Sequence, residues 1–199
     1  AKLRQDQAAR DLVLMLAAML HDLGKANCNR RDPRQIWRTI GHEQVLAPAT
    51  LFLNRYFPGA HLLSQIIPLL RWHGAPHALF HAQAGRKAYA RLALQVPDRS
   101  LLLDLALADA RGAGHLEVPA IASTREIWQQ LGLWKTLPDA LLRGEDLVAL
   151  GVAPGPRLGQ ILRSAYQKQV LEHHHDRRTL LKAMRGLFPE LNPPGAPSC

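Results

Sequence analysis

The chain has 199 residues, of which 47% are hydrophobic and 21% charged, so it can build a core and is not a disordered tail. Its longest apolar run, nine residues from Leu12 to Leu20, is about half of the roughly 20 needed to cross a bilayer, which predicts a soluble protein without a membrane partner. Twenty-five Lys and Arg against 16 Asp and Glu give a net charge of +9. This excess favours a polyanionic partner such as nucleic acid, with a solubility charge as the alternative.

The two cysteines, Cys28 and Cys199, cannot form a disulfide framework, and no secretory signal opens the chain. We therefore expect the reducing cytoplasm as its location. The first residue is Ala1 rather than Met, so we also expect a piece of a longer protein.

Helical spacing of apolar residues, without strand alternation bounded by turns, predicts an all-α protein. The first helix, about residues 11–23, is apolar all round and is expected to be buried, with Gly24 as its stop. Further helices are predicted near 34–40, 43–57, 61–73, 77–95, 99–111, 122–133, 139–150, 156–171 and 176–187.

Gly, Pro and small residues gather over 112–119, which indicates a soft domain boundary. We predict a helical-bundle domain over residues 1–115, a basic helical arm over 116–188 and a disordered Pro-rich tail over 189–199. Residues 143–187 carry eight Lys and Arg against four Asp and Glu, so about half of the net charge lies in this fifth of the chain.

His21 and Asp22 are adjacent at the rim of the first predicted helix. An imidazole and a carboxylate are costly to desolvate there unless they are paired or bound to an ion. A divalent cation taking one nitrogen and one oxygen would satisfy both, and mixed ligation of this kind suits Mn, Fe, Ni, Co or Zn, or Mg if water supplies most ligands. Because two ligands do not make a site, a His–Asp pair that caps the core by hydrogen bonding is the alternative.

More polar residues stand at predicted helix ends, where the helices of a bundle can converge. They are His42 and Glu43, His73 and Asp109. Asp109 is a better ligand candidate than Asp104, which lies about 140° round the same predicted helix and faces elsewhere.

These residues fall within recognisable motifs. LHDLGK at 20–25 resembles the HD motif of metal-dependent phosphohydrolases. GHE at 41–43, RWH at 71–73 and ADARG at 108–112 are similar in order and spacing to the HD domain of bacterial CCA-adding tRNA nucleotidyltransferases. LGVAPGPRLGQIL at 150–162 resembles the start of a helix in the C-terminal arm of CCA-adding and poly(A) polymerase-like enzymes.

The resemblance implies a divalent metal ion such as Mg, Mn or Ni, held by His21, Asp22 and Asp109. It implies contacts to phosphate or a second metal from His42 and His73, and a role for Lys25 in balancing phosphate charge. The cation would lower the pKa of a bound water and polarise a phosphoryl oxygen, so the implied reaction is metal-dependent hydrolysis of a phosphoester. Cyclic phosphates, 2′-nucleotides and RNA ends are the substrates that the resemblance suggests.

The family places one more histidine ligand upstream of the doublet, and residues 1–20 contain none. The nucleotidyltransferase head, with its Gly-rich turn and paired catalytic aspartates, is also missing from this sequence. We therefore expect the C-terminal HD portion of a longer tRNA 3′-end-processing enzyme. The alternatives are a stand-alone HD phosphohydrolase of a small nucleotide and a catalytically degenerate scaffold that binds RNA or its parent head.

Pro154-Gly155-Pro156 opens a helix whose free N–H groups can take an RNA phosphate, although a rigid turn between packed helices is the alternative. Basic side chains follow, and we expect them to bind the backbone of tRNA or another RNA: Arg157, Arg163, Lys168, Arg177 and Arg178. Consecutive helical residues point about 100° apart, so the run His173–His175 is predicted to lie exposed rather than to converge on an ion.

Overall fold

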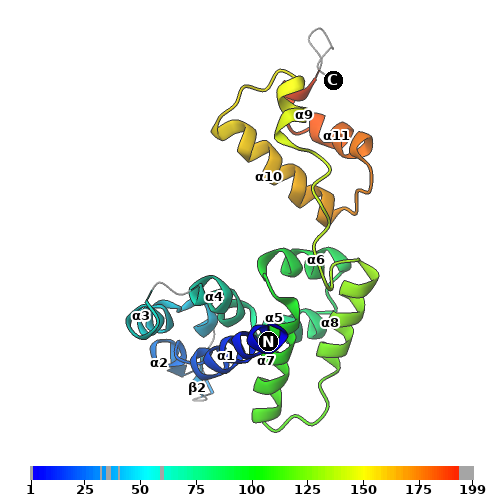
Figure 1. Ribbon diagram of the computed structural model, residues 1–199. Helices are drawn as coiled ribbons and strands as arrows, with labels where there is room; N and C mark the ends of the chain where they lie inside the picture. The colour runs from blue at the N-terminus through cyan, green and yellow to red at the C-terminus, as the bar shows by residue number, and fades with distance from the viewer. Residues whose placement is uncertain (1, 32, 35–36, 40, 59–60, 193–199) are drawn as a thin grey trace. The chain divides into compact units, whose positions relative to one another are not determined.

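The computed structural model describes residues 2–31, 33–34, 37–39, 41–58 and 61–192. Over these residues the protein is all-α, as predicted, with a single short pair of strands (Figure 1). The chain divides into two compact units, residues 1–130 and residues 131–199. Among the described residues no helix is both long and apolar enough to span a membrane.

The first unit is a helical bundle with a small hairpin. Its elements are α1 (Lys2–Leu20), α2 (Lys25–Cys28), β1 (Arg30–Arg31), β2 (Trp37–Arg38), the 3₁₀ turn η1 (His42–Gln44), α3 (Ala47–Tyr56), α4 (Leu62–Trp72), α5 (Ala75–His81), α6 (Arg86–Gln95), α7 (Arg99–Gly112) and α8 (Pro119–Gln130). Helix α1 packs against α4 and α7, and α8 packs against α5 and α6. Because α8 belongs to this bundle, the units divide after Gln130, later than the boundary expected at 115/116.

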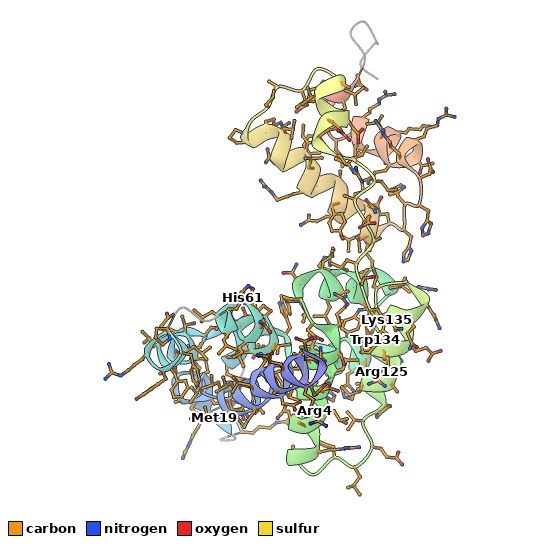
Figure 2. All side chains as sticks on the ribbon, in the orientation of Figure 1. Arg4, Met19, His61, Arg125, Trp134 and Lys135 are labelled. Atoms are coloured by element: carbon orange, nitrogen blue, oxygen red, sulfur yellow. The ribbon has the colours of Figure 1, made fainter. Side chains whose placement is uncertain are left out.

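Helix α1 is amphipathic, so the prediction of an all-round buried helix is wrong. Val13 and Ala17 are almost fully buried on the face that meets the bundle. Met15 and Met19 are 63% and 55% exposed on the other face (Met19 is labelled in Figure 2). The helix ends at Leu20, and the next residues form a turn that carries the His-Asp doublet.

Three other boundaries differ from the prediction for local reasons. Strands β1 and β2 pair antiparallel, with β2 inside the range 34–40 where a helix was expected; residues 35–36 and 40 of that range lie outside the described residues. The helix expected over 77–95 is divided into α5 and α6, with Gln83 at a φ of +48° and Gly85 extended at the start of α6. Helix α3 begins only at Ala47, where a proline occupies the first turn.

The second unit contains α9 (Gly144–Ala149), α10 (Pro156–Leu171), α11 (Arg177–Arg185) and the 3₁₀ turn η2 (Pro189–Leu191). Its core is apolar, and Leu147, Ile161, Leu180, Met184 and Leu191 are fully buried in it. Burial of Leu191 means that 189–191 are folded, which corrects this part of the predicted disordered tail. Residues 193–199 of that tail lie outside the described residues.

Candidate metal centre

Packing of α1 against α4 and α7 brings three helix ends together. His21 follows directly on the end of α1, and His73 caps the C-terminal end of α4. Asp109 lies in the last turn of α7. Residues that are distant in sequence therefore meet because each follows a buried apolar stretch of the same bundle.

Gly24 allows a fourth segment to join them. A Cβ at position 24 would overlap the carbonyl oxygen of His42 and lie 3.0 Å from that of Val45. Only glycine permits this approach, which holds the turn after α1 against η1. As a result, His42 Nε2 lies 3.4 Å from Asp22 Oδ1.

The three histidines of this site make the same contact with the main chain. Each ring contacts, through Nδ1, the main-chain carbonyl oxygen three residues earlier: His21 that of Ala18 at 2.8 Å, His42 that of Thr39 at 2.8 Å and His73 that of Leu70 at 2.7 Å. A carbonyl oxygen only accepts hydrogen bonds, so Nδ1 carries the proton and donates it. In the neutral rings the Nε2 lone pairs are then available to a ligand, as in metal sites.

The Nε2 atoms face carboxylates and one another, and that of His21 is within hydrogen-bonding distance of Asp109. His21 Nε2 lies 3.3 Å from Asp109 Oδ1 and 3.4 Å from Asp22 Oδ2. The ring of His73 lies 5.1 Å from that of His21 and 5.4 Å from that of His42, between centroids. The ligand atoms of His21, His73 and Asp109 all lie within 4.8 Å of one another, and so do those of Asp22, His42 and His73. We call these five residues the HD cluster.

Two polar atoms of the HD cluster are buried and unsatisfied. Asp22 Oδ1 and His42 Nε2 have no hydrogen-bond partner among the described residues, although they lie close together. With Nδ1 protonated, a neutral His42 presents an acceptor to another acceptor, which is unfavourable without a cation between or beside them. The donor set, with its buried orphan atoms, fits a divalent transition-metal ion.

Shifted pKa values keep two members of the cluster in the form that binds metal. Burial lowers the pKa of His73, and the nearby His21 and His42 lower it further, against the opposing effects of its backbone hydrogen bond and of Asp109. Burial raises the pKa of Asp22, but the Lys25 hydrogen bond and the surrounding positive charges outweigh this and lower it overall. His73 is thus held neutral and Asp22 ionised.

Lys25 belongs to the same site, because its Nζ donates to Asp22 Oδ2 at 2.6 Å. Beside Asp22 and Asp109 an open cavity of about 420 Å³ has a floor of small residues and one leucine. The sequence reasoning missed these residues, Ala18, Leu105, Ala108, Gly112 and Ala113. The sequence feature that could have identified them is the run of small side chains beside the motif residues, which leaves space for a ligand.

The predicted RNA-binding residues lie in the second unit, and most of them have acidic partners. Arg157 is paired with Glu190 at 2.6 Å, Lys168 with Glu172 at 2.8 Å and Arg177 with Asp146 at 2.8 Å. Arg163 lies on α10 close to Gly159. Arg177 and Arg178 line a hollow of about 640 Å³ on α11 together with Leu181, Lys182 and Arg185. The structure therefore gathers two of the five residues on one basic surface.

The chain is similar to two bacterial enzymes. It is 34% identical over 171 residues to the A-adding tRNA nucleotidyltransferase of Deinococcus radiodurans, covering 81% of this chain and 38% of the relative. It is also 34% identical over 165 residues to the CC-adding tRNA nucleotidyltransferase of Thermus thermophilus, covering 77% of this chain and 35% of the relative. No family model matches the chain, and no solved structure matches it significantly. Most of the chain is thus homologous to tRNA nucleotidyltransferases that add A or CC. It spans rather more than a third of the length of each of these relatives.

Proposed function

We propose that the first unit is an HD-type, metal-dependent phosphohydrolase, and that the chain is part of a tRNA 3′-end-processing protein. The observation that supports this most is the convergence of three imidazole nitrogens and two carboxylates in the HD cluster, including the buried orphan atoms of Asp22 and His42. Core histidines normally satisfy both ring nitrogens, so a structural role alone leaves this arrangement unexplained.

In this proposal His21, Asp22 and Asp109 hold the ion, as the sequence motifs suggest. The HD motif normally includes a further upstream histidine, which residues 1–20 lack. A ring nitrogen of His73 lies within 4.8 Å of the ligand atoms of both His21 and Asp109, so His73 can supply a nitrogen ligand to the same ion. His42 lies beside Asp22, so that Asp22, His42 and His73 form a second group of possible metal ligands, which shares His73 with the first.

When bound, a divalent ion supplies Lewis-acid polarisation of a phosphoryl oxygen and lowers the pKa of a coordinated water. The protein contributes the rest. Lys25 is 41% exposed and ends at the cavity, so its ammonium can turn from Asp22 to the phosphate of a substrate and offset its charge. The small residues of the cavity floor leave room for the group attached to the phosphate.

The second unit would hold RNA in this proposal. Its support is the relatives' names, which state that they act on tRNA, and the basic surface of α11. Guanidinium and ammonium groups bind phosphates without reading sequence, so the surface suits an RNA backbone. The missing nucleotidyltransferase head would belong to the part of such a protein that this chain does not cover.

The test is hydrolysis of a chromogenic phosphodiester and of 2′,3′-cyclic AMP by the purified chain with Mn²⁺ or Ni²⁺. We expect Asp109→Asn to lower the rate by at least about 100-fold, since even outer partners of metal ligands cost 10–100-fold. Asp104→Asn is the matched control on the same helix, where Asp104 accepts from Ser100 Oγ at 3.5 Å. Equal rates for the two variants, or hydrolysis independent of added metal, would refute the proposal.

A non-catalytic RNA-binding scaffold is the second candidate. The observation in its favour is the short Lys25–Asp22 ion pair, which satisfies one oxygen of Asp22 without any metal. A scaffold predicts that Mn²⁺ leaves the thermal unfolding temperature unchanged. A metal-binding site predicts that the temperature rises with metal concentration, because the ion binds the folded state.

A further inference from the structure

The turn between α10 and α11 carries four consecutive side chains that transition metals favour, Glu172, His173, His174 and His175, which we call the histidine turn. We propose that the histidine turn binds one divalent ion of the zinc, nickel or copper class. Imidazole nitrogens select these metals over Mg or Ca. The site lies entirely in the second unit and shares no residue with the HD cluster.

The backbone of the turn departs from the helix that would separate its rings. Helix α10 ends at Leu171, and His173 has a φ of +55°, a left-handed conformation that is uncommon for residues other than glycine. The rings of His173 and His175 lie side by side, tilted by 51°, with centroids 5.7 Å apart. Two imidazoles on one tetrahedral ion, with bonds of about 2.0–2.1 Å, have centroids roughly 5–6 Å apart. The prediction from helical spacing therefore does not apply to this run.

His174 provides an independent observation. Its side chain is only 18% exposed, and its Nε2 is buried without a hydrogen-bond partner among the described residues. That nitrogen lies 3.5 Å from Glu172 Oε2, close enough for one ion to contact both atoms after a small movement. A buried imidazole nitrogen left without a hydrogen bond is costly, and coordination to an ion would satisfy it.

The histidine turn is held at both ends. On the α10 side, Lys168 Nζ lies 2.8 Å from Glu172 Oε2, and the His174 N–H donates to the Gln169 carbonyl at 3.0 Å. On the α11 side, Asp176 caps the helix by accepting from the N–H of Arg178 and Thr179. Helices α10 and α11 pack against each other (Figure 1). The fixed backbone leaves side-chain rotation, chiefly of the exposed His175, as the movement needed to complete the ligand set.

The experiment is isothermal titration of the full chain with Zn²⁺ and with Ni²⁺, in an Asp22→Asn/Asp109→Asn/His73→Ala background that removes both carboxylates of the HD cluster and the imidazole common to its two ligand groups. We expect one equivalent to bind. We expect His174→Ala to weaken binding at least tenfold, and the nearly isosteric Glu172→Gln to weaken it at least threefold. His115→Ala, an exposed histidine of the first unit, is the control and should leave binding unchanged. Circular dichroism of each variant checks that the second unit is still folded.

A histidine triplet can bind metal weakly in any sequence, so a synthetic peptide of residues 168–179 is measured beside the protein. The proposal requires that the folded chain bind at least tenfold more tightly than this peptide, because the turn is preorganised. Equal affinity of chain and peptide would overturn it, as would unchanged binding by both Glu172→Gln and His174→Ala. The triply substituted background keeps this outcome independent of the proposed phosphohydrolase.

Discussion

Replacing Gly24 by alanine should damage the HD cluster without touching any of its ligands. The new Cβ would overlap the carbonyl oxygen of His42 and lie 3.0 Å from that of Val45, whereas carbon and carbonyl oxygen normally approach to about 3.3 Å. Relief requires η1 or the turn after α1 to shift by roughly 1 Å, since both crowding atoms belong to the main chain. Metal sites tolerate about 0.2 Å, so His42 and Asp22 would no longer share an ion.

We expect Gly24→Ala to lower the free energy of unfolding by about 1–3 kcal/mol, the usual cost of overpacking. Metal affinity should fall at least tenfold. The assays are urea denaturation of the metal-free protein and titration with Mn²⁺. Gly74→Ala is the matched control, because Gly74 precedes α5 with right-handed backbone at φ −80° and a Cβ at this position would meet no other atom within 4 Å. Wild-type stability and wild-type metal affinity in Gly24→Ala would refute the reasoning that joins this turn to His42.

Three further substitutions test hydrogen bonds within each of the two units. Trp128→Phe removes the buried indole N–H that donates to the Tyr89 carbonyl at 2.8 Å, and should cost roughly 2–4 kcal/mol in urea denaturation; a change under about 0.5 kcal/mol contradicts this. Gln169→Leu leaves two main-chain groups of the 139–141 loop unpaired and should destabilise the second unit by roughly 2–4 kcal/mol, visible as earlier loss of its hydrogen-exchange protection. Hydrogen bonds within the α11 cap lower the pKa of Asp176 below its usual 3.8, so its stabilisation is complete above that pH and is lost as the pH falls through the lowered value. Melting temperatures of wild type and Asp176→Ala should therefore differ at pH 7 and converge near pH 2, and a constant difference would exclude this role.

Periodicity predicted the helices well where one apolar face dominates. The helix expected over 156–171 matches α10, and the one over 99–111 matches α7 within a residue. It failed for the all-round burial of α1, because a run of apolar letters does not show which face the neighbouring helices cover. Met15 and Met19 remain exposed for this reason.

The motifs identified the residues of the HD cluster, but spacing alone could not show their arrangement. That Asp109 Oδ1 lies 3.3 Å from His21 Nε2 depends on the packing of α1 against α7. That His73 faces both His21 and His42 depends on where α4 ends and on the hydrogen bond from its Nδ1 to Leu70. The close approach at Gly24 could be recognised only in the structure, since glycine at a helix end is equally explained as a stop signal.

For the basic residues, the sequence predicted the charge of the surface but not the partners of its side chains. Net charge indicated a surface for polyanions, but it did not show that Arg157 and Arg177 are engaged by Glu190 and Asp146. In both pairs the arginine side chain is more than half exposed, and ion pairs at the surface are weak and can exchange for phosphate. The hollow on α11 is formed by residues one turn apart, a pattern that sequence periodicity does contain.

The central claim is that the Nε2 atoms of the HD cluster are unprotonated and share a divalent ion. Long-range ¹H–¹⁵N spectra of the imidazoles at neutral pH, recorded during titration with Zn²⁺, test it most directly. We predict Nδ1-protonated rings for His21 and His73, with Nε2 resonances that change saturably on addition of metal. His61, labelled in Figure 2, lies outside the cluster and should not respond. Nε2-protonated rings, or spectra of His21 and His73 unaffected by metal, would contradict the claim.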